Sequence, residues 1–286
     1  MERQKLAYAY ALLAVFMWST VASAFKLSLK YFNYLNLLFY ASLTSLIVLF
    51  SVLLYQGKLS MLSSSSIRNS AFLGLINPFL YYMILFKAYS LLPAQEAQAL
   101  NYTWPIMLAL LSIPFLKQKI GLKRILGVFM SFFGVLIIAT RGDLLSLNFR
   151  SPLGTLLGLG SAIIWASYWI LNLKDERDDV VRLFLNFAFG FIYIALFILL
   201  FGELQFGIKG LVGSIYVGLF EMGITFLVWH KALSLSETTA QVANLIYLTP
   251  FLSLILIHFI VGEEILASTL LGLVFIVGGI IMGRKG

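Results

Sequence analysis

Long apolar stretches separated by short polar breaks dominate the chain. A helix that crosses a membrane needs about 20 mostly apolar residues, and ten stretches reach roughly that length. Only two breaks are long and polar: 57–69, with a serine run, and 173–182, with a run of charged residues. We therefore predict an all-α membrane protein with ten transmembrane helices, at 6–27, 34–55, 70–91, 95–116, 122–140, 152–173, 181–201, 210–232, 239–261 and 265–283.

The chain also repeats itself. The stretch Lys87–Gly134 is similar to Lys231–Gly279, and the alignment pairs Lys87 with Lys231, Pro105 with Pro250, Gly127 with Gly272 and Gly134 with Gly279. We expect two five-helix repeats, residues 1–140 and 152–286, joined by an external loop at 141–151. Because five is odd, the second repeat would cross the membrane in the opposite sense. Inverted repeats are common in secondary transporters, which bind their substrates near the bilayer midplane between the repeats.

Composition and charge agree with this picture. The chain is 61% hydrophobic and only 11% charged, whereas soluble domains have about a quarter charged residues. With the N-terminus inside, fourteen of the 20 Lys and Arg residues fall on the inner side and six on the outer side. Basic residues favour cytoplasmic loops, so we predict cytoplasmic N- and C-termini in the cell (inner) membrane. The net charge of +8 then needs no nucleic-acid partner.

Several short runs resemble a known family. The arrangement is similar to the drug/metabolite transporter superfamily, and within it to the EamA-type ten-helix permeases. The resemblance covers essentially the whole chain and rests on Trp18-Ser19-Thr20, residues 87–93, Asn101-Tyr102-Thr103-Trp104-Pro105, Gly127–Gly134, Trp165, Lys231-Ala232-Leu233, Pro250, Gly262-Glu263-Glu264 and Gly272–Gly279. It implies export of amino acids, other metabolites or drugs, and the run at 101–105 resembles the aromatic amino-acid exporters of this group.

One acidic residue stands near the middle of a predicted helix. An ionised carboxylate at the bilayer centre costs at least about 2.5 kcal/mol, so Glu221 should face a cavity or a partner. The local offset of 144 residues between the halves makes Asn77 its counterpart. We predict one central cavity in which Glu221 binds a substrate amine or carries a coupled proton. A structural hydrogen bond between helices is the alternative.

Polar stripes on two predicted helices end near prolines. Such prolines free a backbone carbonyl, which is tolerated in a membrane where a cavity or side chains satisfy it. The stripes predict a bent, polar pathway gated at the prolines, and the alternative is a kink with interhelical hydrogen bonds. They comprise Gln98, Asn101 and Tyr102 before Pro105, and Gln241, Asn244 and Tyr247 before Pro250.

Aromatic residues also lie within the predicted hydrocarbon region, although Trp and Tyr usually prefer the interface. They could stack on an aromatic substrate or surround a cation, with helix packing as the alternative. The predicted substrate-binding set is therefore Glu221, Asn77, Tyr81, Asn101, Tyr102, Trp104, Trp18, Trp165, Asn244 and Tyr247.

These features predict a transporter, secondary-active or facilitative, that works by alternating access and is not an enzyme. Its partners would be a small-molecule substrate, the lipid bilayer and a proton as candidate coupling ion, with no cofactor. Neither histidine has ligands at metal spacing and there is no cysteine, so we expect no metal. The chain could act as a monomer or a homodimer. The alternatives are an intramembrane enzyme, which would need two or more converging acids or bases, a lipid- or isoprenoid-linked flippase, and a channel, which would usually show an acidic ring or a filter loop.

Overall fold

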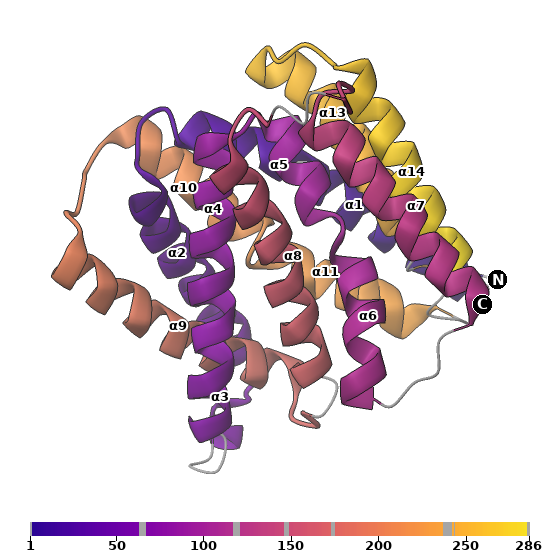
Figure 1. The fold of residues 1–286 in the computed structure, drawn as a ribbon. Helices are drawn as coiled ribbons and strands as arrows, with labels where there is room; N and C mark the ends of the chain where they lie inside the picture. The colour runs from indigo at the N-terminus through magenta and orange to yellow at the C-terminus, as the bar shows by residue number, and fades with distance from the viewer. Residues whose placement is uncertain are drawn as a thin grey trace. The chain divides into compact units, whose positions relative to one another are not determined.

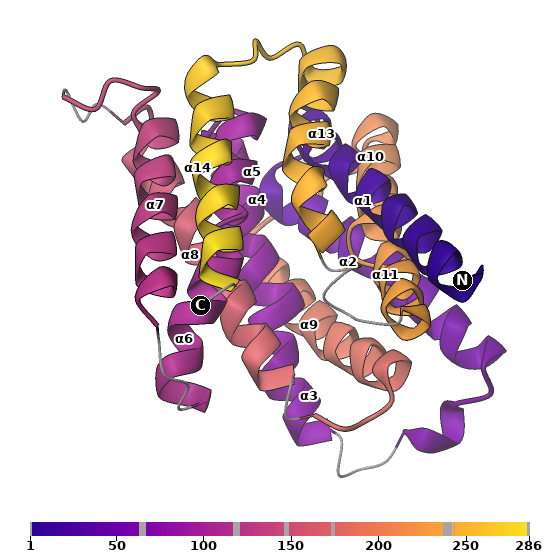
Figure 2. The ribbon, with the colours of Figure 1, turned by 90° about the vertical axis from the view of Figure 1, so that its right-hand side faces the viewer.

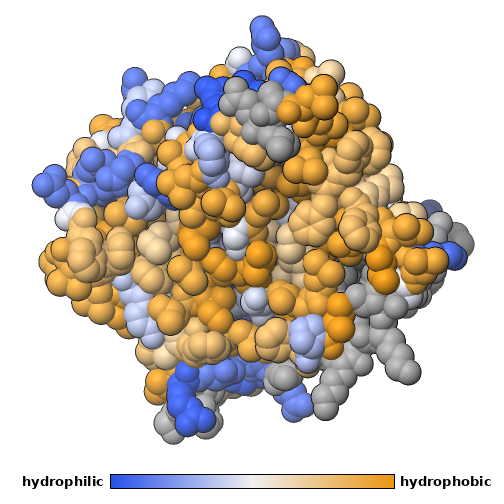
Figure 3. Space-filling model, in the orientation of Figure 1, coloured by the Kyte–Doolittle hydropathy of each residue, from blue (hydrophilic) through white to orange (hydrophobic). Residues whose placement is uncertain are grey.

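The computed structural model describes residues 2–62, 67–116, 121–145, 149–172, 175–236, 242 and 244–284. Every regular element in these ranges is a helix, as predicted. Six helical stretches are long and apolar enough to cross a membrane: Glu2–Ser28, Tyr34–Tyr55, Ile67–Leu91, Pro152–Asn172, Asp179–Phe201 and Ile208–Leu235. Shorter apolar helices cover Ile125–Ala139, Leu245–Val261 and Ala267–Gly283. Apolar side chains predominate on the face shown in Figure 3, as expected for a multi-pass membrane protein.

The chain forms two compact units, and each combines a piece of the first sequence half with a piece of the second. Unit 1 comprises Met1–Phe79 and Arg177–Val261, and unit 2 comprises Leu80–Glu176 and Gly262–Gly286. The helices of unit 1 are α1 (Glu2–Ser28), α2 (Tyr34–Tyr55), η1 (Leu59–Met61), α3 (Ile67–Gly74), α9 (Asp179–Phe201), α10 (Ile208–Phe220), α11 (Ile224–Leu235), η4 (Asn244–Leu248), α13 (Thr249–Leu256) and η5 (Ile257–Val261). Those of unit 2 are α4 (Tyr81–Leu91), α5 (Ala94–Asn101), α6 (Trp104–Leu116), α7 (Leu122–Ala139), α8 (Pro152–Asn172) and α14 (Ala267–Arg284). The helical segment η3 (Leu75–Leu80) leads in sequence from α3 to α4.

Helices pack against partners from the other sequence half. In unit 1, α1 lies along α11 and α13 (Figures 1 and 2), and in unit 2 the corresponding helix α8 lies along α4 and α6. Within unit 1, α3 packs on α9 and α10 packs on α2. The contacts made by the first half are thus repeated by the second half with the roles exchanged, which is the pattern expected of two related repeats.

Glycines permit the closest of these crossings in unit 1. A Cβ on Gly74 would lie 2.4 Å from the carbonyl oxygen of Asn186 in α9, and one on Gly218 would lie 2.4 Å from that of Ala41 in α2. The two glycines occupy equivalent positions in the two halves, 144 residues apart. Each lets the backbone of a helix approach its neighbour directly, as small residues do in membrane helices.

Glycines spaced by seven residues join the last helix of each half in unit 2. A Cβ on Gly127 of α7 would lie 2.4 Å from the carbonyl oxygen of Gly279 in α14, and one on Gly134 would lie 2.5 Å from that of Gly272. Ser131 lies between these contacts and donates to the Ile276 carbonyl at 3.0 Å. The periodic glycines therefore bind α7 and α14 into an antiparallel pair within the chain.

The helix α9 begins with a side-chain cap. Asp178 Oδ1 accepts hydrogen bonds from the backbone N–H groups of Val180 and Val181, at 3.0 and 3.3 Å. Its other carboxylate oxygen accepts from Lys58 Nζ at 2.7 Å. Partial burial tends to raise the pKa of Asp178, but these hydrogen bonds and the Lys58 charge outweigh it and lower the pKa below its ordinary value. The cap fixes the polar connection before α9.

Three of the predicted helices are interrupted, which the hydropathy pattern did not predict. The stretch 70–91 breaks at Asn77, whose backbone is extended (φ −146°, ψ 121°). The stretch 95–116 breaks between Asn101 and Trp104, and the stretch 210–232 breaks between Phe220 and Ile224. The described part of the predicted helix 239–261 consists of residue 242 and the run η4, α13 and η5, whereas residues 239–241 and 243 lie outside the described residues.

Candidate functional site

The break that carries Glu221 lies in unit 1 and is held by side chains. Glu221 directly follows α10 as its C-terminal cap, its N–H donates to the Val217 carbonyl at 2.8 Å, and it is half-buried. The next carbonyl, that of Met222, accepts a hydrogen bond from Ser45 of α2 at 2.8 Å. The Thr225 hydroxyl donates to the Phe220 carbonyl. Side chains therefore satisfy backbone groups that an uninterrupted helix would pair internally.

Asn77 occupies the equivalent break of the first half, also in unit 1. The residue is 1% exposed, and its side-chain oxygen accepts no hydrogen bond from the described residues. The following residue, Pro78, has no N–H to donate and packs on Gly190 of α9, where a Cβ would lie 2.4 Å from Pro78 Cδ. An unpaired buried carbonyl costs about 1–3 kcal/mol. Such a group in a native structure calls for a partner such as a bound water, ion or ligand.

The helix α1 runs past the Glu221 break. Thr20 and the Tyr216 hydroxyl are hydrogen-bonded at 2.7 Å. The Trp18 ring lies 5.7 Å from the Phe226 ring and 5.6 Å from the Trp229 ring, centre to centre. The contacted residues lie both before residue 221 (Tyr216) and after it (Phe226 and Trp229). The break therefore lies opposite the Trp18-Ser19-Thr20 run of α1.

A second group of predicted residues meets in unit 2. The Tyr81 ring of α4 stacks on the Trp165 ring of α8, with centroids 4.7 Å apart and planes 25° apart. Asn101, the last residue of α5, donates from Nδ2 to Ser161 Oγ at 2.9 Å and lies within 3.3 Å of the Tyr81 hydroxyl. Tyr81 is 3% exposed and Trp165 is 9% exposed. Three helices thus share a buried aromatic and polar cluster, Tyr81–Asn101–Ser161–Trp165.

The residues after Asn101 form the turn between α5 and α6. Tyr102 is half-buried, and the Thr103 hydroxyl donates to the Leu100 carbonyl at 2.7 Å. Pro105 lies in the first turn of α6, where a missing N–H removes no helical hydrogen bond. Trp104 packs against a cluster formed by Met107, Ala162 and Ala166. This contact agrees with the helix-packing alternative for Trp104.

The second proline has a similar place in unit 1. Pro250 lies at the start of α13, directly after η4. Tyr247 in η4 is 6% exposed. The side chain of Asn244 and all of Gln241 lie outside the described residues.

The predicted set is therefore divided between the units. Trp18, Asn77, Glu221, Tyr247 and Pro250 belong to unit 1, and Tyr81, Asn101, Tyr102, Trp104, Pro105 and Trp165 belong to unit 2. Direct contacts join Tyr81, Asn101 and Trp165. In the parts of the chain that the structure describes, no three His, Asp or Glu residues are grouped as metal ligands would be.

Sequence reasoning missed three supporting residues. Ser45 and Ser161 hold the Glu221 break and Asn101, and serines within apolar helices carry no pattern that distinguishes them. Glu263 accepts hydrogen bonds from the backbone N–H groups of Ala94, at 2.8 Å, and Gln95, at 3.3 Å. It thereby caps α5 from a distant part of the chain. The pair of acidic residues at 263–264 was visible in the sequence, but nothing in the sequence indicated that Glu263 would bind the start of α5.

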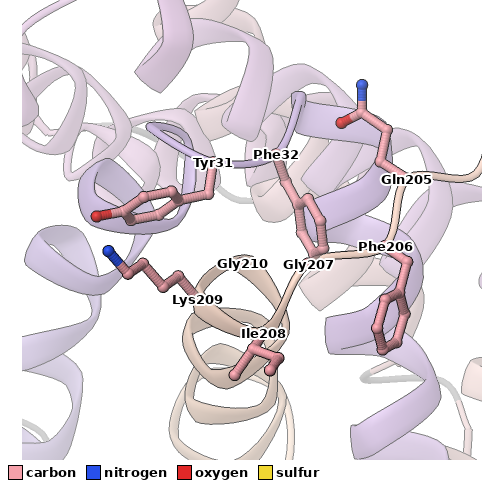
Figure 4. Close-up of a pocket in the computed structure, with 8 residues that line it drawn as sticks. All are labelled: Tyr31, Phe32, Gln205, Phe206, Gly207, Ile208, Lys209 and Gly210. Atoms are coloured by element: carbon pink, nitrogen blue, oxygen red, sulfur yellow. The ribbon is translucent and has the colours of Figure 1, made fainter.

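A surface pocket of about 400 Å³ lies in unit 1, where α1 ends and α10 begins. Its lining includes Tyr31, Phe32 and Lys209, and the Lys209 ammonium lies 5.5 Å from the centre of the Tyr31 ring (Figure 4). None of the predicted site residues lines it.

Comparison with known proteins places this architecture in a family. The model of the EamA-like transporter family matches residues 5–140 and 152–283. A protein of Archaeoglobus fulgidus named an uncharacterized transporter is 25% identical over 94% of this chain and 93% of its own length. The Bacillus subtilis protein YdfC, also named an uncharacterized transporter, is 29% identical over 73% of this chain and 68% of its own. A solved structure titled only as a crystal structure of a protein shares the fold, with a TM-score of 0.68 and 20% identity over 98% of both chains. The resemblance to the drug/metabolite transporter superfamily is thereby confirmed, and the chain belongs to the EamA-like transporter family.

Proposed function

We propose that this protein is a secondary transporter that moves small metabolites, such as amino acids, across the cytoplasmic membrane by alternating access. The observation that carries the proposal is the pair of helix breaks at Asn77 and Glu221, which occupy equivalent positions in the two halves. Many secondary transporters bind substrates and coupling ions at such interrupted helices, because the break offers unpaired backbone groups and helix-dipole ends. Export is the direction that the family resemblance favours.

The proposed topology has ten crossings in two inverted repeats, residues 1–140 and 152–286, with both termini cytoplasmic. Contacts between connecting segments support it, because each joins segments that the charge pattern assigns to the same side. The pairs are Lys58 with Asp178 inside (2.7 Å), Asn36 with the Glu203 carbonyl outside (2.9 Å), and Ala94 with Glu263 outside (2.8 Å).

Single cysteines test this topology, because the chain has no cysteine of its own. Leu145 is 98% exposed in the connecting loop and Tyr55 is 93% exposed at the end of α2. In intact cells, a membrane-impermeant maleimide should label Leu145→Cys at once and Tyr55→Cys only after permeabilisation. Labelling of both from outside would contradict the inverted arrangement.

Glu221 has a proposed role in transport because it is the only carboxylate well inside a predicted helix. As one of the predicted substrate-binding residues, Glu221 would pair with a substrate or carry a coupled proton. The helix breaks would let the two halves rearrange during transport. A single mid-helix carboxylate argues against an intramembrane enzyme, which needs several converging groups. The proposed partners are thus a small solute, the lipid bilayer and a proton. We propose no cofactor, and the protein would act as a monomer or a homodimer.

Counterflow in proteoliposomes tests transport directly. Vesicles containing the purified chain and loaded with an unlabelled amino acid should accumulate the labelled form, and vesicles without protein should not. The panel spans aromatic, aliphatic and polar amino acids and phenethylamine. If no solute in the panel exchanges above the protein-free control, the transport proposal loses its support.

A further inference from the structure

We propose that the substrate is recognised through a protonated amine, which docks at the helix breaks of unit 1, and that a substrate carboxylate is not required. The inference rests on the proposed transport function and narrows its substrate class.

Each of the two breaks carries a side-chain oxygen that can accept a hydrogen bond. Glu221 supplies a carboxylate, and the Asn77 side-chain oxygen is buried with no donor from the described residues. Pro78 adds no N–H, and the nearby Met222 carbonyl is already paired with Ser45. An ammonium group has up to three donors and no acceptor, so it matches this chemistry.

Positive charge is missing from the interior of the same helices. The sequence has no Lys or Arg in 6–25, 34–55, 69–86, 183–208 or 210–229, which are the central parts of the long helices of unit 1 and of α4. A substrate carboxylate would find no cationic side chain there, and an uncompensated charge in such a region is costly. A cationic substrate would instead find acceptor oxygens there, on Glu221 and Asn77.

Aromatic rings border the Glu221 break. Trp18 contacts Phe226 and Trp229, and Tyr216 lies 4.6 Å from Phe220, ring centre to ring centre. Faces of such rings attract cations, most strongly for Trp and most where water is excluded. Acceptor oxygens and aromatic rings together favour an organic amine over an anion or a neutral polar solute.

The test compares three forms of one solute. Whichever amino acid exchanges in counterflow is tested beside its decarboxylated amine and its deaminated acid; for phenylalanine these are phenethylamine and 3-phenylpropionate. The amine and the amino acid should both exchange, whereas the deaminated acid should not compete even in tenfold excess. Glu221→Gln should lower amine exchange by about tenfold to a hundredfold, because it removes a charge-assisted hydrogen bond.

Glu203→Gln is the matched control, since Glu203 is an exposed carboxylate outside the helices, and it should exchange normally. Thermal unfolding of each variant checks the fold, and Glu221→Asp, which keeps the charge, should retain preference for amines if Glu221→Gln unfolds. Exchange of the deaminated acid, exchange of the amino acid without its amine, or unchanged amine exchange by a folded Glu221→Gln variant would overturn the inference and leave transport standing. If no solute of any class moves, the proposed function itself fails.

Discussion

The Gly218→Ala variant is expected to unfold at a markedly lower temperature than the unmodified chain and to lose transport. The added Cβ would lie 2.4 Å from the Ala41 carbonyl oxygen and 2.6 Å from Thr44 Cβ. Both atoms belong to α2 at or next to its backbone, so no flexible side chain can move aside and the α2–α10 crossing must open. Overpacking of this kind costs about 1–3 kcal/mol and sometimes more. Gly218 precedes Glu221 by about one helical turn, so opening the crossing would also displace the helix break at Glu221.

Thermal unfolding in detergent, followed by tryptophan fluorescence, measures the loss, and counterflow measures transport. Gly160→Ala is the matched control, because no heavy atom lies within 4 Å of a Cβ at Gly160 in α8. That variant should be as stable as the unmodified chain or slightly more stable, since alanine favours helix over glycine. Equal stability of the two variants would show that α2 and α10 do not cross as closely as described.

Asn101→Leu is expected to reduce transport by about tenfold or more, with a loss of stability of about 1–3 kcal/mol. Leucine has nearly the same size but cannot donate to Ser161 or approach the Tyr81 hydroxyl as a polar partner. The Tyr81–Asn101–Ser161–Trp165 cluster would lose the amide that ties α5 to α4 and α8. Counterflow and thermal unfolding, measured on the same preparations, separate the two effects.

Asn172→Leu serves as the comparison for that substitution. Asn172 ends α8 in the same unit and its amide donates to the Tyr168 carbonyl at 2.8 Å, away from the predicted binding residues. It should change stability slightly and leave transport intact. A transport-competent Asn101→Leu variant would mean that Asn101 is a structural hydrogen bond between helices, the alternative that its polar stripe left open.

Part of the candidate site was accessible from the sequence. The offset of 144 residues between the halves pairs Asn77 with Glu221, and the structure has helix breaks at both positions. The breaks themselves were not predicted at 77 and 221, because hydropathy averages over a window and passes across a short turn. Proline was an incomplete guide: Pro78 lies at a break and Pro105 and Pro250 begin helices, but the break at Glu221 has no proline.

The sequence by itself determined that this is a helical membrane protein with two related halves and that it resembles the EamA-type permeases. These properties follow from the composition, from the recurrence of apolar stretches long enough to cross a membrane, and from short sequence motifs. Each of these can be read without knowing which helices are neighbours. Only the tertiary structure decided that helices exchange partners between the halves, that Gly127 meets Gly279, and that Ser45 and Ser161 support the Glu221 break and Asn101. The physical reason is that partner choice among apolar helices depends on surface shape and on single hydrogen bonds between distant residues. Hydropathy measures the free energy of transferring each residue from water to lipid, and this free energy does not depend on which helix becomes the neighbour.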